Sequence, residues 1–308
     1  MTTHTEELPS LVLDKIGESF DEGVAARILE GFHAANERPV TLRVNTLKAD
    51  AGRIGRALEA AGIAFERVSW YPDAFVLEGV RERHVWPLDI YGNGEVYLQS
   101  LSSMLPPLAL DPRAGADILD MCAAPGGKTS QMAALACGEA RITACELSAP
   151  RAAKLEHNLD KLGVRGVQVL RTDARRLDEF FSFDQVLLDA PCTGTGTLRA
   201  DDARAHDRIT RKLLERTTRA QRALIDRGLT VLKPGGRLVY STCSILPDEN
   251  EEIVAAALRR HRDCEIKPLR GDWVDDTPAL PCRIEGALTV MPTRLHEGFF
   301  VALIEKAR

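Results

Sequence analysis

Two cysteines of this sequence, Cys192 and Cys243, each follow an apolar segment that is typical of a buried strand. A thiolate is a strong nucleophile, and its addition to carbon 6 of a pyrimidine ring makes carbon 5 reactive toward an electrophilic methyl group. A single cysteine in such a place is more often a small buried apolar residue. Two of them, beside a loop suited to an adenosyl ligand, predict a cysteine-dependent methylation of a pyrimidine base.

That loop has the sequence CAAPGGKT, residues 122–129, and it follows another apolar segment. A P-loop would need a glycine where this sequence has Cys122, and a dinucleotide fold would need a G-x-G-x-x-G run, which is absent. What remains is a glycine turn, with Glu146 twenty residues after Gly126 to hold ribose hydroxyls and Asp173 beyond it for an adenine amino group. These residues fit S-adenosylmethionine as well as they fit a dinucleotide.

The elements that must position these residues alternate regularly through the second part of the chain, as apolar strand, tight turn and helix. This order is typical of a parallel sheet with helices on both faces, in which ligands bind beyond the carboxyl ends of the strands. The predicted strands are residues 117–122, 141–146, 167–172, 183–190 and 236–242, with 264–269 and 298–305 as further strands at the sheet edge. The predicted helices are residues 128–136, 149–162, 207–232 and 248–260, and KPGG at 233–236 is expected as a turn.

The first part of the chain has a different pattern, and we place a domain boundary there, between residues 1–95 and residues 96–308. The predicted elements are a strand at 40–47, a helix at 54–61 capped by Asp50 and closed by Gly62, and short strands at 64–68 and 74–77. This order predicts a small α+β domain. Before it, residues 11–33 are expected as one or two helices broken at Gly17 and Gly23.

Composition limits the class of protein. With 308 residues, 44% of them hydrophobic and 28% charged, the chain is globular rather than disordered, collagenous or coiled-coil. It has no apolar run of membrane-spanning length and no signal-peptide pattern at residues 1–7, so we expect a cytoplasmic protein without a membrane partner. Its seven cysteines form no C-x-x-C pair, so neither a disulfide framework nor a metal site is expected. The net charge of −5 argues against indiscriminate binding of phosphates. We also expect the protein to be a monomer.

Four motifs, taken in order, resemble those of the RNA cytosine-5 methyltransferases of the Nol/Nop/Sun family. They are CAAPGGKT at 122–129, DAPCTGTG at 189–196, STCS at 241–244 and PDENE at 247–251. Segments 42–48, 99–104 and 297–301 resemble the family's RNA-binding domain, its lead-in to the catalytic domain and its last strand. The resemblance covers roughly residues 38–305 and implies a Rossmann-like class I methyltransferase fold, a doubly wound α/β sheet, with a small N-terminal RRM-like domain.

The resemblance also implies a role for each matching residue. The cofactor S-adenosylmethionine would be held by Cys122, Ala123, Ala124, Pro125, Gly126, Gly127 and Lys128, with Glu146 on its ribose and Asp173 at its adenine. Asp189 would face the target cytosine and the methionine end of the cofactor, Cys243 would attack carbon 6, and Cys192 would help to release the product. The assignment between the two cysteines comes from the resemblance alone. DNA cytosine methyltransferases use the cysteine of their Pro-Cys motif, and by that analogy Cys192 would be the nucleophile.

The expected partner is ribosomal or transfer RNA, with the target cytosine unstacked or flipped out because the attack comes from beside the ring plane. Candidate RNA contacts are one stripe of the predicted helix 207–232, together with two basic residues of the N-terminal domain: Arg208, Lys212, Arg216, Arg219, Arg43 and Lys48. A solvated charged face is an equal alternative for the stripe. Candidate stacking surfaces are Trp70, Tyr71 and Trp86. Residues 198–203 (LRADDA) depart from the basic His-Pro segment of many family members, which leaves the choice of RNA open.

Two other functions remain as alternatives. One is a catalytically silent RNA-binding or assembly factor on the same fold, although a scaffold would not require both Cys192 and Cys243. The other is a DNA cytosine methyltransferase. It is disfavoured because those enzymes lack the second strand-end cysteine and add a target-recognition domain, for which we expect no room here.

Overall fold

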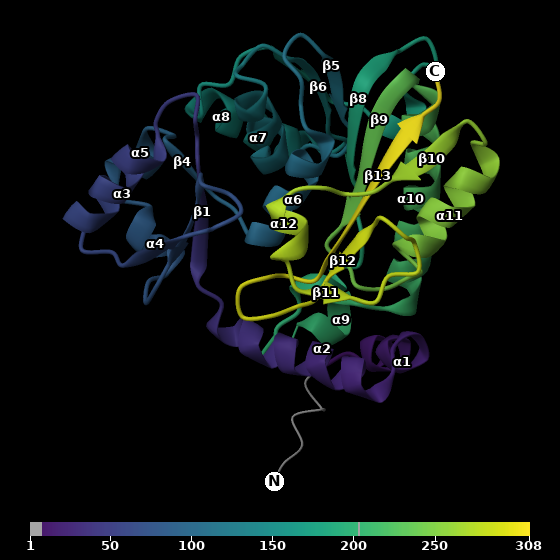
Figure 1. The fold of residues 1–308 in the computed structure, drawn as a ribbon, viewed down its shortest axis with the longest axis horizontal. Helices are drawn as coiled ribbons and strands as arrows, with labels where there is room; N and C mark the ends of the chain where they lie inside the picture. Colours follow the sequence, from purple (N-terminus) through teal and green to yellow (C-terminus); the bar gives the residue numbers. More distant parts are fainter. Residues whose placement is uncertain (1–7, 203) are drawn as a thin grey trace.

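The computed structural model describes residues 8–202 and 204–308, and the larger part of it is a nine-stranded sheet with helices on both faces (Figure 1). Five of these strands are parallel and lie in the order β7, β6, β5, β8, β9. Their bounds are β5 Asp117–Asp120, β6 Arg141–Cys145, β7 Val167–Leu170, β8 Phe183–Asp189 and β9 Leu232–Thr242. The five parallel strands predicted from the sequence are thus confirmed. The strand order reverses between β5 and β8, and the carboxyl ends of strands at such a point form a ligand-binding crevice.

The rest of this large sheet is antiparallel. It comprises β10 Cys264–Lys267, β11 Ala279–Leu280, β12 Leu288–Val290 and β13 Phe299–Lys306. Both further strands expected from the sequence exist, as β10 and β13. The expectation that β13 lies at the edge is wrong, because it pairs with β9 on one side and with β12 and β10 on the other.

Successive residues of the central strands face two separate cores, as the period of a strand requires. Ile118 and Leu187 pack against α6 (Leu101–Leu110), α7 (Gly127–Leu135) and α8 (Ala149–Lys161). Leu119 and Leu188 pack against α10 (Arg211–Thr230) and α11 (Glu251–Arg260) on the other face. The helices therefore cover both faces of the sheet and hold its strand ends rigidly in place.

A second, small sheet has the antiparallel order β2-β3-β1-β4. Its strands are β1 Val40–Val44, β2 Phe65–Arg67, β3 Ala74–Leu77 and β4 Val96–Leu98, with helices α3 Ala51–Ala60, α4 Glu82–Val85 and α5 Asp89–Gly92. The Asp50 side chain accepts a hydrogen bond from the backbone N–H of Arg53 and so caps α3, as predicted. Since β4 completes this sheet just past residue 95, we propose that the boundary between the two domains lies at this point of the chain.

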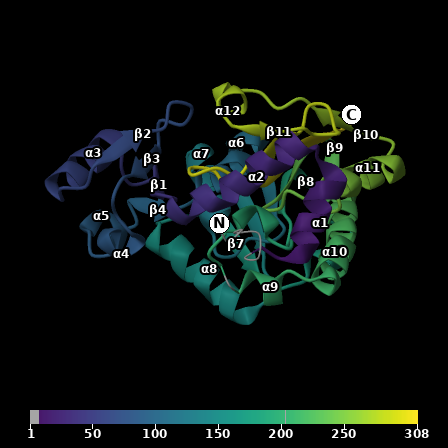
Figure 2. The same cartoon turned by 90° about the horizontal axis from the view of Figure 1, so that it is seen from below.

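Two N-terminal helices, α1 (Ser10–Ser19) and α2 (Glu22–Ala34), lie across the underside of the large-sheet part rather than on the small sheet (Figure 2). Val12 and Phe32 pack there against Leu214 of α10 and Ile245. The predicted breaks at Gly17 and Gly23 are wrong, because both glycines are inside helices. The break falls at Phe20 and Asp21, where the Asp21 carboxylate caps α2 by accepting from the backbone N–H of Val24. Among the described residues, no helix has both the length and the apolar character needed to cross a bilayer.

Three local features differ from the sequence prediction. Helix α6 was not predicted, because it is apolar all round and contains two prolines. The predicted helix 207–232 is two helices, α9 (Ala205–Arg208) and α10, because the Thr210 hydroxyl accepts from the backbone N–H of Leu213 and starts α10 anew. The predicted turn at 233–236 lies inside β9, where the pairing with β8 shifts register.

Candidate active site

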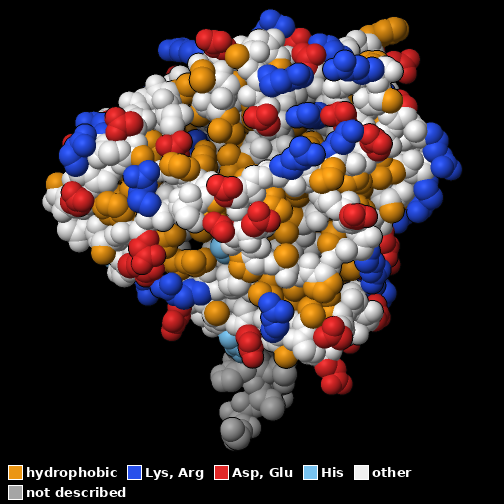
Figure 3. All heavy atoms as spheres, viewed as in Figure 1, with side chains coloured by type: hydrophobic (Ala, Val, Ile, Leu, Met, Phe, Trp, Pro, Cys, Tyr) orange, Lys and Arg blue, Asp and Glu red, His pale blue; other side chains and the backbone are white. Residues whose placement is uncertain are grey.

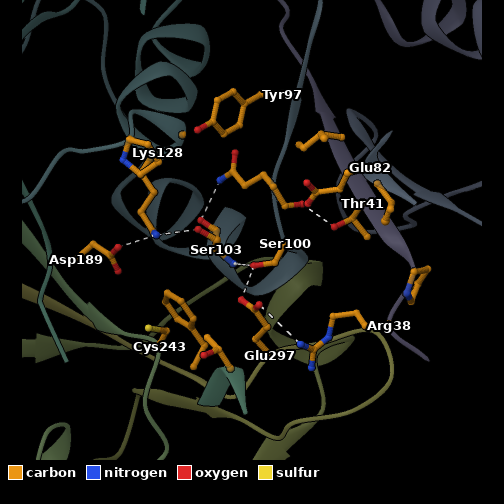
Figure 4. A pocket seen from close by; sticks show the side chains of 18 of the residues that line it. Arg38, Thr41, Glu82, Tyr97, Ser100, Ser103, Lys128, Asp189, Cys243 and Glu297 are labelled. Atoms are coloured by element: carbon orange, nitrogen blue, oxygen red, sulfur yellow. Dashed lines mark hydrogen bonds and ion pairs between the residues drawn. The ribbon is translucent and has the colours of Figure 1, made fainter. Parts of the chain in front are cut away.

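A cavity of about 820 Å³ lies at the carboxyl ends of β5, β8 and β9, between the large sheet and the small one. Its wall includes most of residues 120–128 and some residues of β1 and β4. Asp120 is the end of β5, and we call residues 121–128 the glycine loop. Lys128, Asp189 and Cys243 lie together at one end of the cavity, and Arg38, Thr41 and Glu82 at the other (Figure 4). The sheet topology therefore brings the predicted loop and one of the two cysteines to one cavity.

The two glycines let the loop lie close to its neighbours. Gly126 has a φ of 107°, and a Cβ there would approach a side-chain carbon of Leu155 to 2.9 Å. A Cβ on Gly127 would come equally close to the ring of Tyr97. Larger residues at either position would force the loop outward, and this is why the chain has glycines here.

Asp120, the last residue of β5, lies beneath the loop and was missed by the sequence prediction. It is 1% exposed, and its carboxyl accepts from the Thr129 hydroxyl at 2.7 Å and from the backbone N–H of Cys122 at 3.4 Å. Burial raises the pKa of Asp120 to about 6. Burial also raises the pKa of the Cys122 thiol well above its ordinary value, which disfavours its thiolate form. The signal available in the sequence was that Asp120 ends a strand at the ligand-binding edge.

Lys128 and Asp189 form an ion pair inside the cavity, with 2.7 Å between Nζ and Oδ2 (Figure 4). The Lys128 ammonium also donates to the hydroxyl of Ser103, and the Ser241 hydroxyl donates to the other oxygen of Asp189. Burial lowers the pKa of Lys128, but the charge and hydrogen bond of Asp189 and the nearby Cys243 outweigh it, so the pKa lies above its ordinary value. Lys128 is therefore a fixed positive charge beside Asp189 and Cys243.

The two cysteines predicted to carry the chemistry are in contact, with their sulfur atoms 3.2 Å apart. Cys243 lines the cavity, whereas Cys192 lies behind it. The hydrogen bond with Cys243, together with burial, raises the pKa of the Cys192 thiol well above its ordinary value. Cys192 is therefore protonated at neutral pH and can donate to the Cys243 sulfur.

The motif PDENE holds both cysteine loops through two fully buried side chains. Glu249 accepts from the backbone N–H and the hydroxyl of Thr193, from the hydroxyl of Thr217 and from the amide of Gln221. The Asn250 amide oxygen accepts from the hydroxyl of Thr242, and its NH₂ group donates to a backbone carbonyl beyond Cys243. The sequence prediction assigns this motif no role, and its position in the structure is that of a rigid support.

Three predicted cofactor residues do not line the cavity in the described part of the chain: Gly126 within the loop, and Glu146 and Asp173 after the next two strands. Glu146 follows β6, is 5% exposed, accepts from the backbone N–H of Ser148 and lies 3.4 Å from Arg151. Asp173 follows β7 and is paired with Arg175 at 2.6 Å. Both sit at the predicted edge of the sheet, and their roles toward a ligand remain predictions.

The structure corrects the prediction that Arg43 contacts RNA. Arg43 is 1% exposed, and its guanidinium is enclosed between the small sheet and α7. Lys48 is exposed, but its ammonium donates to the carbonyls of Asn93 and Lys161 and so joins α5 to α8. The sequence could not distinguish these two basic residues of one predicted segment, because their burial depends on the packing of α7.

The predicted basic stripe is divided between two helices instead of lying on one, and its contact with RNA stays a prediction. Arg208 ends α9 and is paired with Asp202, whereas Lys212, Arg216 and Arg219 are exposed along α10. Basic and acidic side chains are interspersed over the face seen in Figure 3.

Of the candidate stacking residues, Tyr71 is buried and stacks on the half-buried Trp70, while Trp86 is 52% exposed. Ala203, the last residue of the divergent segment, and residues 1–7 lie outside the described residues. Within the described ranges, no group of three or more His, Cys, Asp and Glu side chains is arranged to hold a metal ion.

Comparison with known proteins identifies two matching family descriptions. Residues 107–305 match "16S rRNA methyltransferase RsmB/F", and residues 9–82 match the ferredoxin-like domain of the RsmF/B-like methyltransferases. The order β2-β3-β1-β4 of the small sheet agrees with a ferredoxin-like, RRM-like domain. The predicted fold, a Rossmann-like methyltransferase sheet with such a domain before it, is thus confirmed.

Similar proteins agree with these matches. The chain is 36% identical to "Ribosomal RNA small subunit methyltransferase F" of Shewanella sp. (strain ANA-3), covering 91% of this chain and 59% of that protein, and 36% identical to its namesake in Cronobacter sakazakii, covering 97% and 63%. The chain thus spans about 60% of the length of these curated relatives.

Solved structures are similar over nearly the whole chain. A methyltransferase homologue from Pyrococcus horikoshii is 35% identical, with a TM-score of 0.77 over 97% of this chain and 100% of that one. NSun6 from the same organism, solved with SFG, is 23% identical with a TM-score of 0.84 over 98% and 99%, and shares the fold.

Proposed function

The chain belongs to the 16S rRNA methyltransferase RsmB/F family, and on that premise we propose that it transfers a methyl group from S-adenosylmethionine to carbon 5 of a cytosine in RNA. Of the two RNA classes that the sequence left open, we propose ribosomal RNA, because the curated relatives are named for it. The observation that carries the proposal is Cys243 in the wall of the cavity, beside the Lys128–Asp189 ion pair and 3.2 Å from Cys192.

The glycine loop supports S-adenosylmethionine as the cofactor. Its glycines let the loop pack closely against Leu155 of α8 and Tyr97 of β4, and most of the loop lines the cavity, where its backbone can approach the ribose and methionine parts of a nucleoside ligand. Glu146 and Asp173, at the ends of the next two strands, would hold its ribose and adenine. When bound, S-adenosylmethionine supplies the electrophilic methyl group that the activated carbon 5 accepts.

The side chains of this chain would act on the cytosine. The Cys243 thiolate adds to carbon 6, and the resulting negative charge spreads over the ring toward its polar edge. The Lys128 ammonium, held by Asp189 and Ser103, is a preorganised, mostly buried positive charge and stabilises the charge on the ring. Asp189 accepts hydrogen bonds and can take one from the amino group of the cytosine.

Cys192 would serve the end of the reaction. After methyl transfer, a base must remove the proton on carbon 5 so that Cys243 can leave carbon 6. The Cys192 thiol lies in contact with the Cys243 sulfur and is held there by the loop that Glu249 supports. We propose that it promotes the departure of Cys243 by donating to the leaving sulfur.

The first test is methyl transfer by Cys243→Ala. We expect this variant to lose more than about 10³-fold in rate, because the nucleophile is removed, while its affinity for S-adenosylmethionine stays within about twofold of wild type. Transfer of labelled methyl groups to RNA, with bisulfite sequencing of RNA from cells with and without the gene, measures both the reaction and its site. Full activity of Cys243→Ala would contradict the nucleophile assignment. If cells without the gene retain every 5-methylcytosine of wild-type RNA, the catalytically silent assembly factor is favoured.

The matched variant, Cys192→Ala, separates the roles of the two cysteines. It should accumulate a covalent protein–RNA adduct, visible as a slowly migrating band on a denaturing gel, because formation of the adduct is intact and its breakdown is slow. If the adduct instead accumulates with Cys243→Ala, the two roles are reversed.

A further inference from the structure

Arg43 is the largest side chain among those that are fully buried in the described residues. In the described part of the chain, no carboxylate lies within ion-pair distance of its guanidinium. The charge of Asp73 acts on it only from beyond that distance. A buried positive charge without a directly paired carboxylate is costly, and such charges persist when many hydrogen bonds hold them in one geometry. This residue therefore needs an explanation beyond packing.

The hydrogen bonds of Arg43 join the small sheet to the glycine loop. On the side of the small sheet, the guanidinium donates to the Gln99 amide oxygen at 3.1 Å and to the Val44 carbonyl at 3.3 Å. On the other side it donates to the Ser130 hydroxyl at 2.9 Å and to the Gly127 carbonyl at 3.4 Å. Gly127 and Ser130 are in the first turn of α7, the helix that begins directly from the glycine loop. One side chain of the N-terminal domain thus fixes the turn that ends this loop.

A second branch of the same network reaches the reacting end of the cavity. The Gln99 NH₂ group donates to the Ser103 carbonyl and to the Gln131 side chain, so that Gln99 is held between Arg43 and α6. The Ser103 hydroxyl in turn accepts from the Lys128 ammonium. Gln99, Ser103 and Lys128 all line the cavity. Arg43 thereby supports two parts of one wall, the loop backbone and the residue that holds Lys128.

The planar guanidinium suits this position because its donors point in several fixed directions at once, which a lysine ammonium on a flexible stem cannot reproduce. A methionine would fill the space but leave the Gln99, Ser130 and Gly127 acceptors without this donor. The consequence would be a looser first turn of α7, and so a glycine loop without one defined conformation.

We propose that Arg43 is a positioning residue through which docking of the N-terminal domain sets the conformation of the glycine loop, and with it the affinity for S-adenosylmethionine. The ligand in this statement rests on the function proposed above. The small domain is then part of the cofactor site itself, in addition to any contact it makes with RNA.

The experiment is isothermal titration calorimetry of the full chain with S-adenosylmethionine. Arg43→Met should raise Kd on the order of tenfold, the effect of losing one or two well-formed hydrogen bonds, and Arg43→Lys should recover part of the affinity. The matched control is Arg56→Met, an exposed arginine on α3, which should bind within about twofold of wild type. In methylation assays, the KM for S-adenosylmethionine should rise in Arg43→Met by more than kcat at saturation falls, because Lys128 keeps its ion pair with Asp189. Wild-type affinity in folded Arg43→Met, or a lower kcat with an unchanged KM, would overturn the proposal.

Amide hydrogen exchange without cofactor gives an independent readout. Residues 127–131 should exchange faster in Arg43→Met than in wild type or Arg56→Met, and equal exchange would overturn the proposal. If Arg43→Met does not fold, Ser130→Ala removes one acceptor of Arg43, together with the hydrogen bond from the Ser130 hydroxyl to the Gly127 carbonyl. It should raise Kd a few-fold, whereas unchanged binding and exchange would count against the proposal. Failure of the wild-type protein to bind S-adenosylmethionine would instead contradict the proposed function, and hydrogen exchange would still decide the role of Arg43.

Discussion

Glu249 and Arg43 are both ionisable side chains that are fully buried, and neither forms an ion pair within the described residues, yet they act in different parts of the molecule. The Glu249 carboxylate receives four hydrogen bonds, all from residues 193–221, so it organises the Cys192 loop within one domain. Arg43 gives four, and they are divided between the small sheet and α7. Glu249 therefore supports the structure within one domain, whereas Arg43 connects two domains.

This difference indicates which of the two residues should affect stability and which should affect ligand binding. The donors around Glu249 are in the interior of the larger domain, so its loss leaves the backbone N–H and hydroxyl of Thr193 without a partner and weakens the fold. The acceptors around Arg43 include two backbone carbonyls at an interface between domains, where small movements can restore contacts with water. We therefore expect Glu249 to affect stability more and Arg43 to affect ligand binding more.

The largest expected effect on stability is that of Glu249→Ala. It should lower the free energy of unfolding by about 3 kcal/mol or more, because the backbone N–H and hydroxyl of Thr193 lose their acceptor in the protein interior, and Thr217 and Gln221 each lose one of their acceptors. Urea denaturation measures this loss, and Glu252→Ala, on the exposed side of α11, is the matched control with an expected change below about 0.5 kcal/mol. A loss no larger than that of the control, or one smaller than that of Arg43→Met, would break the comparison.

Asp120 extends the comparison to a buried acid whose charge is disfavoured. Its pKa is about 6 in the folded protein against an ordinary value of 3.8, so ionisation destabilises the fold as pH rises from about 4 to about 6. Asp120→Asn removes this cost, and its stability relative to wild type should increase by up to ~3 kcal/mol between pH 4 and pH 7 and then stay constant.

Urea denaturation at several pH values checks this, with Asp117→Asn as the control at the other end of β5. The hydrogen bond and charge of Arg141 lower the pKa of Asp117, so its ionised form contributes stability above pH 4 that is lost in acid. Asp117→Asn should therefore become less stable relative to wild type as pH rises, which is the opposite sign. If both variants respond to pH in the same direction, burial does not control the charge of Asp120.

The smallest expected effect is on RNA binding, and it distinguishes the buried Arg43 from the exposed basic side chains of α10. If Lys212, Arg216 and Arg219 of α10 contact phosphates, alanine at any of them should weaken binding of a short cytosine-containing single-stranded RNA a few-fold and lower the salt-dependence slope by about 1. Arg43→Met should leave that slope unchanged, because its side chain is buried. Fluorescence anisotropy at several salt concentrations measures both. If the salt-dependence slope falls in Arg43→Met but not in the α10 variants, Arg43 and not α10 contacts the RNA phosphates.

Prediction from the sequence was most accurate where the signal is local. The parallel strands are short apolar runs, and their carboxyl ends had to share one edge, so the sequence pattern alone assigned the glycine loop and Cys243 to one site. Asp50 was recognisable as a helix cap because capping depends on residues three positions apart. Helix α6 and the start of α10 were missed or misplaced, because apolar periodicity is absent in the first and a threonine cap decides the second.

The sequence by itself therefore determined the family, the order of the elements and the edge of the sheet where the chemistry must occur. Only the tertiary structure decided that Arg43 is buried, that Cys192 and Cys243 touch, that Lys128 pairs with Asp189 and that Glu249 supports the loop of Cys192. The physical reason is that strand and loop signals come from neighbours along the chain, whereas burial and pairing depend on residues that are remote in sequence and meet only when the two sheets and their helices pack together.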